Sequence, residues 1–202
     1  MVRKSKPAVA FEVVAVAVAA SAGGLNALSR VLGDLPEEFS APLLVVQHLD
    51  PRHKSLMAQI LARRTALSVE EARDGEEIQE GHIYVALSNK HLLVAAGGIL
   101  SLTQSELVNF VRPSADLMFE SIAACFGDKV IAVILSGSGS DGTNGLKAVK
   151  EMGGTTIAQD EKTSEHFGMP GSAIKTGCVD FVLSLEEIAP ALVMLVEKGS
   201  KP

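Results

Sequence analysis

Short continuous apolar runs alternate along this chain with segments whose apolar residues recur at helical spacing. The runs predict strands at residues 13–19, 42–47, 130–135, 155–159 and 179–183, and residues 68–72 are a further short strand candidate. The helical spacing predicts helices at residues 24–32, 55–64, 113–126, 144–152 and 185–196, with a helical turn at 172–175. Apolar runs bounded by turn residues are typical of strands covered on both faces. We therefore expect an α/β fold, a doubly wound and mainly parallel sheet with helices on both faces.

A different pattern occupies residues 82–102. Three short strands are predicted here, at 82–87, 91–95 and 99–102, and turn residues separate them. Short strands joined by such turns favour antiparallel pairing. We expect an antiparallel hairpin region inserted into the α/β pattern, with His82 and His91 at the surface.

The length of 202 residues suits one domain with a substantial core. We expect an N-terminal tail at 1–12, one domain at 13–197 and a C-terminal tail at 198–202. No stretch reaches the roughly 20 apolar residues that span a bilayer, so no membrane insertion is expected. The net charge of −6 argues against a nucleic-acid partner. Two cysteines give neither a disulfide framework nor metal-ligand spacing, which favours a cytoplasmic protein.

Three polar residues follow predicted strands and are the candidates for chemistry. Ser21 lies on a glycine turn after the first strand, His48 follows the second, and Asp141 follows the strand at 130–135. Ligands of open α/β sheets bind at the carboxyl ends of strands, where such side chains can converge. A serine hydroxyl needs a base to become a nucleophile, and a carboxylate can orient a histidine for that role. These residue types are therefore those required for acyl transfer.

Each of the three residues also has a simpler interpretation. Ser21 could cap the first helix, His48 could be an ordinary turn residue, and Asp141 could cap the helix that starts near Thr143. A phosphate cradle at Gly23 and the glycine-serine loop at 136–142 is a further alternative. Neither segment matches the dinucleotide-binding or Walker A pattern, which weakens that alternative.

Several short motifs occur along the chain in an order that points to a family. They are Ala20-Ser21-Ala22-Gly23-Gly24, Gln47-His48, Arg112-Pro113-Ser114-Ala115-Asp116, Leu135-Ser136-Gly137-Ser138-Gly139-Ser140-Asp141-Gly142, Ala158-Gln159-Asp160-Glu161 and Gly168-Met169-Pro170. With this ordered set the chain resembles the catalytic domain of bacterial chemotaxis protein-glutamate methylesterases (CheB type). The resemblance covers roughly residues 13–197.

The resemblance implies a function and a site. It implies hydrolysis of glutamate γ-methyl esters on the cytoplasmic helices of chemoreceptors, with release of methanol, and in some members deamidation of receptor glutamines. Ser21 would be the nucleophile, His48 the general base and acid, and Asp141 the orienting carboxylate. The oxyanion would lie against backbone N–H groups near Ala22 and Gly23. No metal or organic cofactor is implied.

The chain departs from the family pattern at a few positions. Ser138 replaces a methionine that lies beside the active site, and Val111 stands where a histidine is common. The segment 48–55 looks more like a branch fused to a receptor methyltransferase and sensory modules, which makes such modules candidate partners. An esterase for another substrate and a non-catalytic interaction module of the same fold are the alternatives.

A local basic patch could offset the negative net charge of the chain. Arg52, Lys54, Arg63 and Arg64 cluster in the sequence after His48. Such a patch would favour encounter with a Glu-rich receptor helix.

Overall fold

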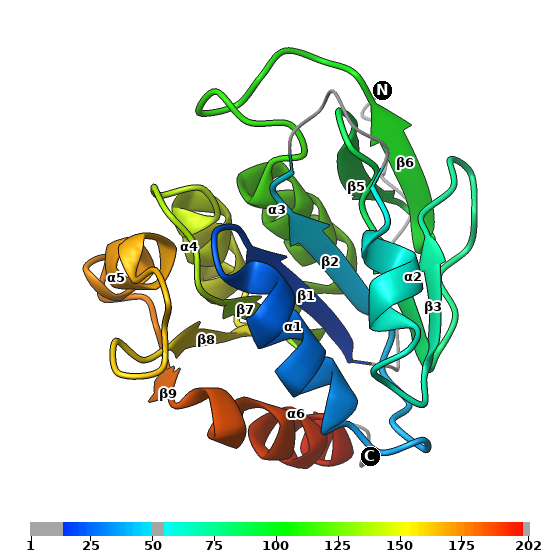
Figure 1. The fold of residues 1–202 in the computed structure, drawn as a ribbon. Helices are drawn as coiled ribbons and strands as arrows, with labels where there is room; N and C mark the ends of the chain where they lie inside the picture. Colours follow the sequence, from blue (N-terminus) through cyan, green and yellow to red (C-terminus); the bar gives the residue numbers. More distant parts are fainter. Residues whose placement is uncertain (1–13, 50–54, 200–202) are drawn as a thin grey trace, which may run out of the picture.

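A seven-stranded sheet runs through the centre of the structure, a computed structural model that describes residues 14–49 and 55–199 (Figure 1). From one edge to the other, the strands are β3 (Ser68–Glu71), β4 (His82–Val85), β2 (Leu43–Gln47), β1 (Ala15–Ala20), β7 (Val130–Ile134), β8 (Thr155–Gln159) and β9 (Phe181–Leu183). All neighbouring strands of this sheet are parallel. Strands β2, β3 and β4 lie on one side of β1, and the later strands β7, β8 and β9 lie on its other side. The predicted doubly wound parallel fold is confirmed.

Helices cover both faces of the sheet. On one face lie α1 (Gly24–Gly33), α2 (Met57–Leu61) and α6 (Leu185–Gly199). On the other lie α3 (Ala115–Phe126), α4 (Thr143–Glu151) and α5 (Gly168–Ile174), with a short 3₁₀ turn, η1 (Gly127–Lys129), after α3. Successive residues of β1 alternate between the two cores, as the two-residue period of a strand requires. Because both of their faces are buried, the central strands β1 and β7 are apolar throughout.

The predicted hairpin is present, but it is smaller than expected. Strands β5 (His91–Ala95) and β6 (Ile99–Thr103) pair antiparallel, apart from the main sheet, and pack over α3. The assignment of residues 82–87 to this hairpin was wrong, since β4 is a parallel strand of the main sheet between β2 and β3. Ile83, Tyr84 and Val85 are all buried, and a continuous apolar run of this kind is typical of an interior parallel strand.

Two helices differ from their predicted extent. Helix α2 is shorter than the predicted 55–64, because Arg63 and Arg64 close tight turns with backbone hydrogen bonds to residues three positions earlier. Helix α5 begins at Gly168 instead of residue 172. Pro170 lies in its first turn, where the missing backbone N–H has no partner within the helix to lose.

The ends of the chain are only partly described. The predicted tail at 1–12 lies outside the described residues, as do residues 200–202. Residues 198 and 199, predicted to be in a C-terminal tail, continue helix α6 instead. In the part of the chain that the structure describes, every helix is too short or too polar to cross a membrane.

Candidate active site

The three predicted catalytic residues follow three neighbouring strands of the sheet. Ser21 follows β1 and His48 follows β2, next to the paired residues Ala20 and Gln47. Asp141 lies in the loop after β7, the neighbour of β1 on its other side. Strand pairing continues a little beyond the strand ends, since the His48 amide donates to the Ala20 carbonyl at 3.1 Å. The sheet therefore brings all three loops to its carboxyl edge.

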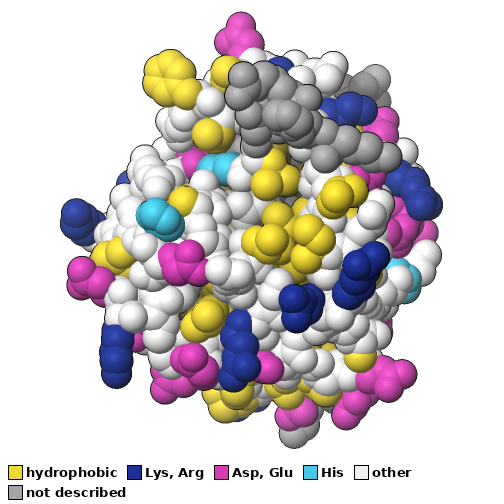
Figure 2. All heavy atoms as spheres, viewed as in Figure 1, with side chains coloured by type: hydrophobic (Ala, Val, Ile, Leu, Met, Phe, Trp, Pro, Cys, Tyr) yellow, Lys and Arg dark blue, Asp and Glu magenta, His cyan; other side chains and the backbone are white. Residues whose placement is uncertain are grey.

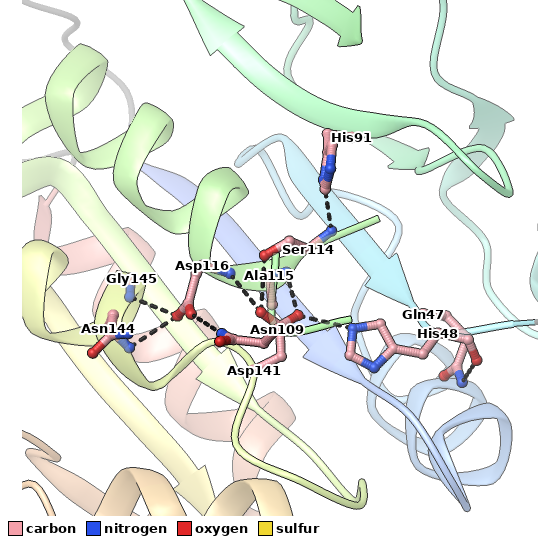
Figure 3. A network of polar contacts seen from close by, with 10 residues as sticks. All are labelled: Gln47, His48, His91, Asn109, Ser114, Ala115, Asp116, Asp141, Asn144 and Gly145. Atoms are coloured by element: carbon pink, nitrogen blue, oxygen red, sulfur yellow. Dashed lines mark hydrogen bonds and ion pairs between the residues drawn. The ribbon is translucent and has the colours of Figure 1, made fainter. Parts of the chain in front are cut away.

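The closest contact among the three is between His48 and Asp141. Nε2 of His48 lies 2.9 Å from Oδ2 of Asp141, and Figure 3 shows the imidazole pointing at the carboxylate. The side chains are 14% and 4% exposed, respectively. A carboxylate on one ring nitrogen fixes the tautomer of a histidine and stabilises its protonated form.

Asp141 is held by the start of helix α3. Its Oδ1 accepts hydrogen bonds from the Ser114 hydroxyl at 2.8 Å and from the Asp116 amide at 3.3 Å. Its Oδ2 accepts from the Ala115 amide at 2.6 Å. Ser114 occupies the N-cap position of α3, but its side chain makes no capping hydrogen bond and donates to Asp141 instead. Asp141 therefore supplies the acceptor that the first turn of α3 needs.

These contacts set the charge of Asp141. Burial, the largest influence, raises the pKa of this carboxyl, but hydrogen bonds from His48, the Ala115 amide and Ser114 lower it. The net result is a pKa below the ordinary value, so Asp141 is an anion at neutral pH. An ionised carboxylate is the form that supports a histidine as it takes up a proton.

A second carboxylate, Asp116, caps the neighbouring helix α4. Its Oδ1 accepts from the amides of Asn144 and Gly145, each at 2.9 Å, and its Oδ2 accepts from Asn109 at 3.1 Å. The alternative that Asp141 caps the helix near Thr143 was therefore wrong, since Asp116 from α3 does so. Asp141, which precedes α4, thus caps α3, and Asp116, which lies in α3, caps α4 (Figure 3).

Ser114 lies between His91 and Asp141. The Ser114 amide donates to Nδ1 of His91 at 3.1 Å, and Nε2 of His91 lies 3.0 Å from the carbonyl of Glu106. Both Ser114 and His91 are fully buried, so the prediction that His91 lies at the surface was wrong. Burial of His91 is possible because both ring nitrogens have partners. Since the hydroxyl of Ser114 donates to Asp141 and is out of reach of solvent, this row of groups orients Asp141.

The turn that carries Ser21 is tight. Gly23, not Ser21, is the N-cap of α1, and no side chain caps this helix, so the capping interpretation of Ser21 was wrong. Gly23 has a φ of 74°, a left-handed conformation that favours glycine. A Cβ on Gly137 would lie 3.0 Å from Cβ of Ser21, so the loop after β7 approaches the serine at a residue without a side chain.

Two side chains that belong to the ordered motifs, and to which the sequence assigned no role, hold this turn in place. Nε2 of Gln47 donates to the carbonyls of Ser21 at 2.7 Å and His48 at 3.0 Å. The hydroxyl of Ser136 donates to the Ala22 carbonyl at 2.8 Å and accepts from the His166 amide at 3.0 Å. Both are buried polar residues at the ends of apolar runs, and that placement is the signal that could have found them.

The loop before α5 borders the same turn. Glu165 accepts a hydrogen bond from Asn26 of α1 at 2.7 Å, and a Cβ on Gly23 would lie 2.8 Å from Cβ of Glu165. Ser138 is exposed in the loop after β7, and its Cα would lie 3.1 Å from a Cβ placed on Gly168. The predicted roles of Ala22, Gly23 and Ser138 in binding substrate stay predictions.

A cavity of about 180 Å³ opens beside His48. It is lined by His48, Leu49, Asn89, Leu107, Phe110, Val111 and Arg112. A larger cavity, about 420 Å³, lies between α2 and the edge strand β3 and contains none of the predicted catalytic residues. The smaller cavity adjoins the site, because His48 is one of its lining residues.

The predicted basic patch is described only in part. Arg63 and Arg64 are exposed after α2, whereas Arg52 and Lys54 lie outside the described residues. The patch stays a prediction.

Comparison with known proteins identifies the family. The CheB methylesterase family matches residues 16–192. A Leptospira interrogans protein is 43% identical over 181 residues, which are 90% of this chain and 94% of that protein. A "Protein-glutamate methylesterase/protein-glutamine glutaminase" of Pyrococcus horikoshii is 40% identical over 96% of this chain, which spans only 54% of that relative.

A solved structure has the same fold. The crystal structure of the Thermotoga maritima CheB methylesterase catalytic domain is 40% identical, covers 91% of this chain and 98% of that one, and has a TM-score of 0.88. The family that the ordered motifs predicted is thus confirmed, although nothing in the comparisons places the chain in the fused branch. The chain belongs to the CheB methylesterase family.

Proposed function

We propose that this chain is a serine esterase that removes methyl groups from glutamate γ-methyl esters on the cytoplasmic helices of chemoreceptors. The observation that carries the proposal is the His48–Asp141 pair, 2.9 Å apart, at the end of the strand next to the one that Ser21 follows. Family membership supports the reaction type, since relatives carry the name protein-glutamate methylesterase.

In the first half of the reaction, Ser21 attacks the ester carbonyl while His48 takes the hydroxyl proton. Asp141, held as an anion by its hydrogen bonds, stabilises the imidazolium that forms. The negative charge on the carbonyl oxygen would lie against the N–H groups of Ala22 and Gly23. These N–H groups lie at the start of α1, where the positive end of the helix dipole favours an anion.

In the second half, methanol leaves and water completes the turnover. His48 returns its proton to the departing methoxide, and the glutamyl group stays as an ester on Ser21. A water molecule, activated by the same histidine, then attacks that ester and frees the glutamate. Deamidation of glutamine would follow the same steps with ammonia as the leaving group. None of these steps uses a metal or organic cofactor.

The proposal extends to the domain and its setting. Residues 13–197 form the catalytic domain, and methylated receptor helices are the substrate. Ser138 and the turn residues Ala22 and Gly23 contact that substrate. Because chemoreceptor methylation sites face the cytoplasm, the enzyme acts there. A receptor methyltransferase or sensory module is a proposed partner on the strength of the segment 48–55 alone.

The test is methanol release from a methylated chemoreceptor cytoplasmic fragment. Ser21→Ala should reduce release by at least about 10³-fold, because the nucleophile is lost. Ser101→Ala, which removes another partly buried hydroxyl on strand β6, serves as the matched control and should leave the rate unchanged. Full activity of Ser21→Ala would refute the assignment of the nucleophile. Failure of the folded wild type to release methanol would favour another ester or a non-catalytic module.

A further inference from the structure

The loop between β6 and α3 ends in a strained tip beside the site. Val108 and Val111 pair through two backbone hydrogen bonds of 3.2 and 2.9 Å, so residues 109 and 110 form a two-residue turn. Asn109 has a φ of 50° and Phe110 a φ of 65°. Two successive left-handed residues make the turn type that usually has glycine at the second position. A phenylalanine there is costly, and such strain persists where surrounding contacts impose it.

Those contacts are present at the base of the tip. Asn109 donates to Asp116, the carboxylate that caps α4. Arg112 donates to the side-chain oxygen of Asn89 at 2.9 and 2.7 Å and to the carbonyls of Gln104 and Ser105 at 3.0 and 2.5 Å. Arg112 therefore holds the loop by contacts on both sides, and Asn109 fixes the tip relative to Asp116 and the start of α4.

The fixed tip presents apolar surface to solvent. Phe110 is 94% exposed, Leu107 is 54% exposed and Leu49, directly after His48, is 36% exposed. All three line the cavity that includes His48. In Figure 2, hydrophobic side chains stand out at the upper left, over the loop between β6 and α3. We call Leu49, Leu107 and Phe110 the apolar rim.

We propose that the apolar rim binds an apolar side chain of the receptor helix, on the same polypeptide as the methyl ester and about one helical turn from it. This inference rests on the proposed function. The occupant follows from continuity with the site, since His48 must reach the ester and also lines the cavity of the rim. A helix repeats a face about every 5.4 Å, so a side chain three or four residues from the ester lies within reach of a neighbouring pocket.

The chemistry of the rim fits an apolar anchor. Among the described residues that line the cavity there is no carboxylate, and the cation Arg112 is engaged by the loop carbonyls and Asn89. The rim thus offers hydrophobic contact and little charge. Burial of an exposed aromatic ring is the main favourable contribution that such a surface can make to binding.

The test compares Phe110→Ala with Phe181→Ala. Phe181 is an exposed phenylalanine on the edge strand β9 and is the matched control. Each variant is assayed on a methylated receptor fragment and on a small ester such as p-nitrophenyl acetate. We expect Phe110→Ala to reduce kcat/KM on the receptor about tenfold or more, mainly through KM, and to leave small-ester turnover within about twofold of wild type. Phe181→Ala should match wild type on both, and Phe110→Leu should recover most of the receptor activity.

The outcomes separate this proposal from the proposed function. Equal receptor activity of wild type and Phe110→Ala overturns the rim proposal alone. Equal loss on both substrates also overturns it, because the residue then supports the site and not the receptor contact. Conversion of a dimer to a monomer by Phe110→Ala, without a change in hydrolysis, would assign the ring to self-association instead. Absence of methanol release by wild type overturns both proposals together.

Discussion

Helices α3 and α4 begin side by side, and each start is capped by a carboxylate from the other helix's segment. Asp141, just before α4, caps α3, and Asp116, in the first turn of α3, caps α4. The two carboxylates have the same task in the fold, yet their pKa values move in opposite directions. Burial is the largest influence on both, and it raises the pKa of each.

The difference comes from what else each carboxylate faces. Asp141 faces His48 and the Ser114 hydroxyl, which favour its ionised form and bring its pKa below the ordinary value. Burial and the nearby charge of Asp141 outweigh the backbone hydrogen bonds to Asp116, and in the described part of the chain no cation offsets them, so the pKa of Asp116 is above the ordinary value. The crossed caps therefore place a carboxylate with a lowered pKa at the histidine and a carboxylate with a raised pKa behind it.

The sharpest way to separate the two is a pair of carboxamide variants. Asp141→Asn should reduce kcat by about 10³ to 10⁴, because an amide cannot stabilise the imidazolium; the analogous change in a well-studied serine protease costs about 10⁴. Asp116→Asn should change kcat by less than about tenfold. Methanol release at saturating substrate, with circular dichroism to confirm folding, measures both. Similar losses in the two variants would contradict the division of roles.

Substitution of Asp116 should lower the stability of the fold more than it lowers kcat. Asp116→Ala removes the acceptor of the Asn144, Gly145 and Asn109 donors, and should cost about 2 kcal/mol of unfolding free energy. Asp116→Asn keeps an acceptor and should cost less than half as much. Urea denaturation followed by circular dichroism measures the difference. Equal destabilisation by Ala and Asn would show that the charge of Asp116, not its hydrogen bonding, holds the cap.

The smallest effect lies in the pH dependence of stability. The lowered pKa of Asp141 makes its stabilising contribution full above the ordinary value of 3.8 and progressively lost as the pH falls through the folded-state value. The raised pKa of Asp116 has the opposite sign, so its contribution is full below 3.8 and is lost as the pH rises through the folded-state value. Asp141→Asn should therefore reduce the loss of stability that occurs as the pH falls below 3.8. Asp116→Asn should reduce the loss of stability that occurs as the pH rises above 3.8. Denaturation midpoints at a series of pH values between about 2 and 7 measure both slopes.

The same comparison shows which features of the site could be predicted from the sequence and which could not. Convergence of Ser21, His48 and Asp141 was predictable, because parallel strands end at one edge of a sheet and each residue follows a strand. The crossed caps were not, since they depend on where α3 lies relative to α4. In sequence, Ser114 and Asp141 each precede a helix and each has the composition of an ordinary N-cap. Only the packing of the two helices shows that Asp141 caps the helix that Ser114 precedes.

The remaining errors also arise from tertiary contacts. His91 was placed at the surface because a histidine that opens a short strand is usually solvated. Its burial depends on the Ser114 amide and the Glu106 carbonyl, which satisfy both ring nitrogens. Strand β4 was assigned to the hairpin because short strands follow it closely, although its unbroken apolar run already favoured the main sheet.

The order of the strands also bears on the sequence in which the site assembles during folding. Strands β1 and β2 are close in sequence, so pairing them closes a short loop and brings Ser21 next to His48 early in folding. Strand β7 joins β1 only after more than a hundred residues, and His48 and Asp141 are 93 positions apart. Formation of non-local parallel pairs is intrinsically slow. We therefore expect that, during refolding, Ser21 and His48 come together before Asp141 arrives, and that recovery of esterase activity would report the pairing of β7 with β1.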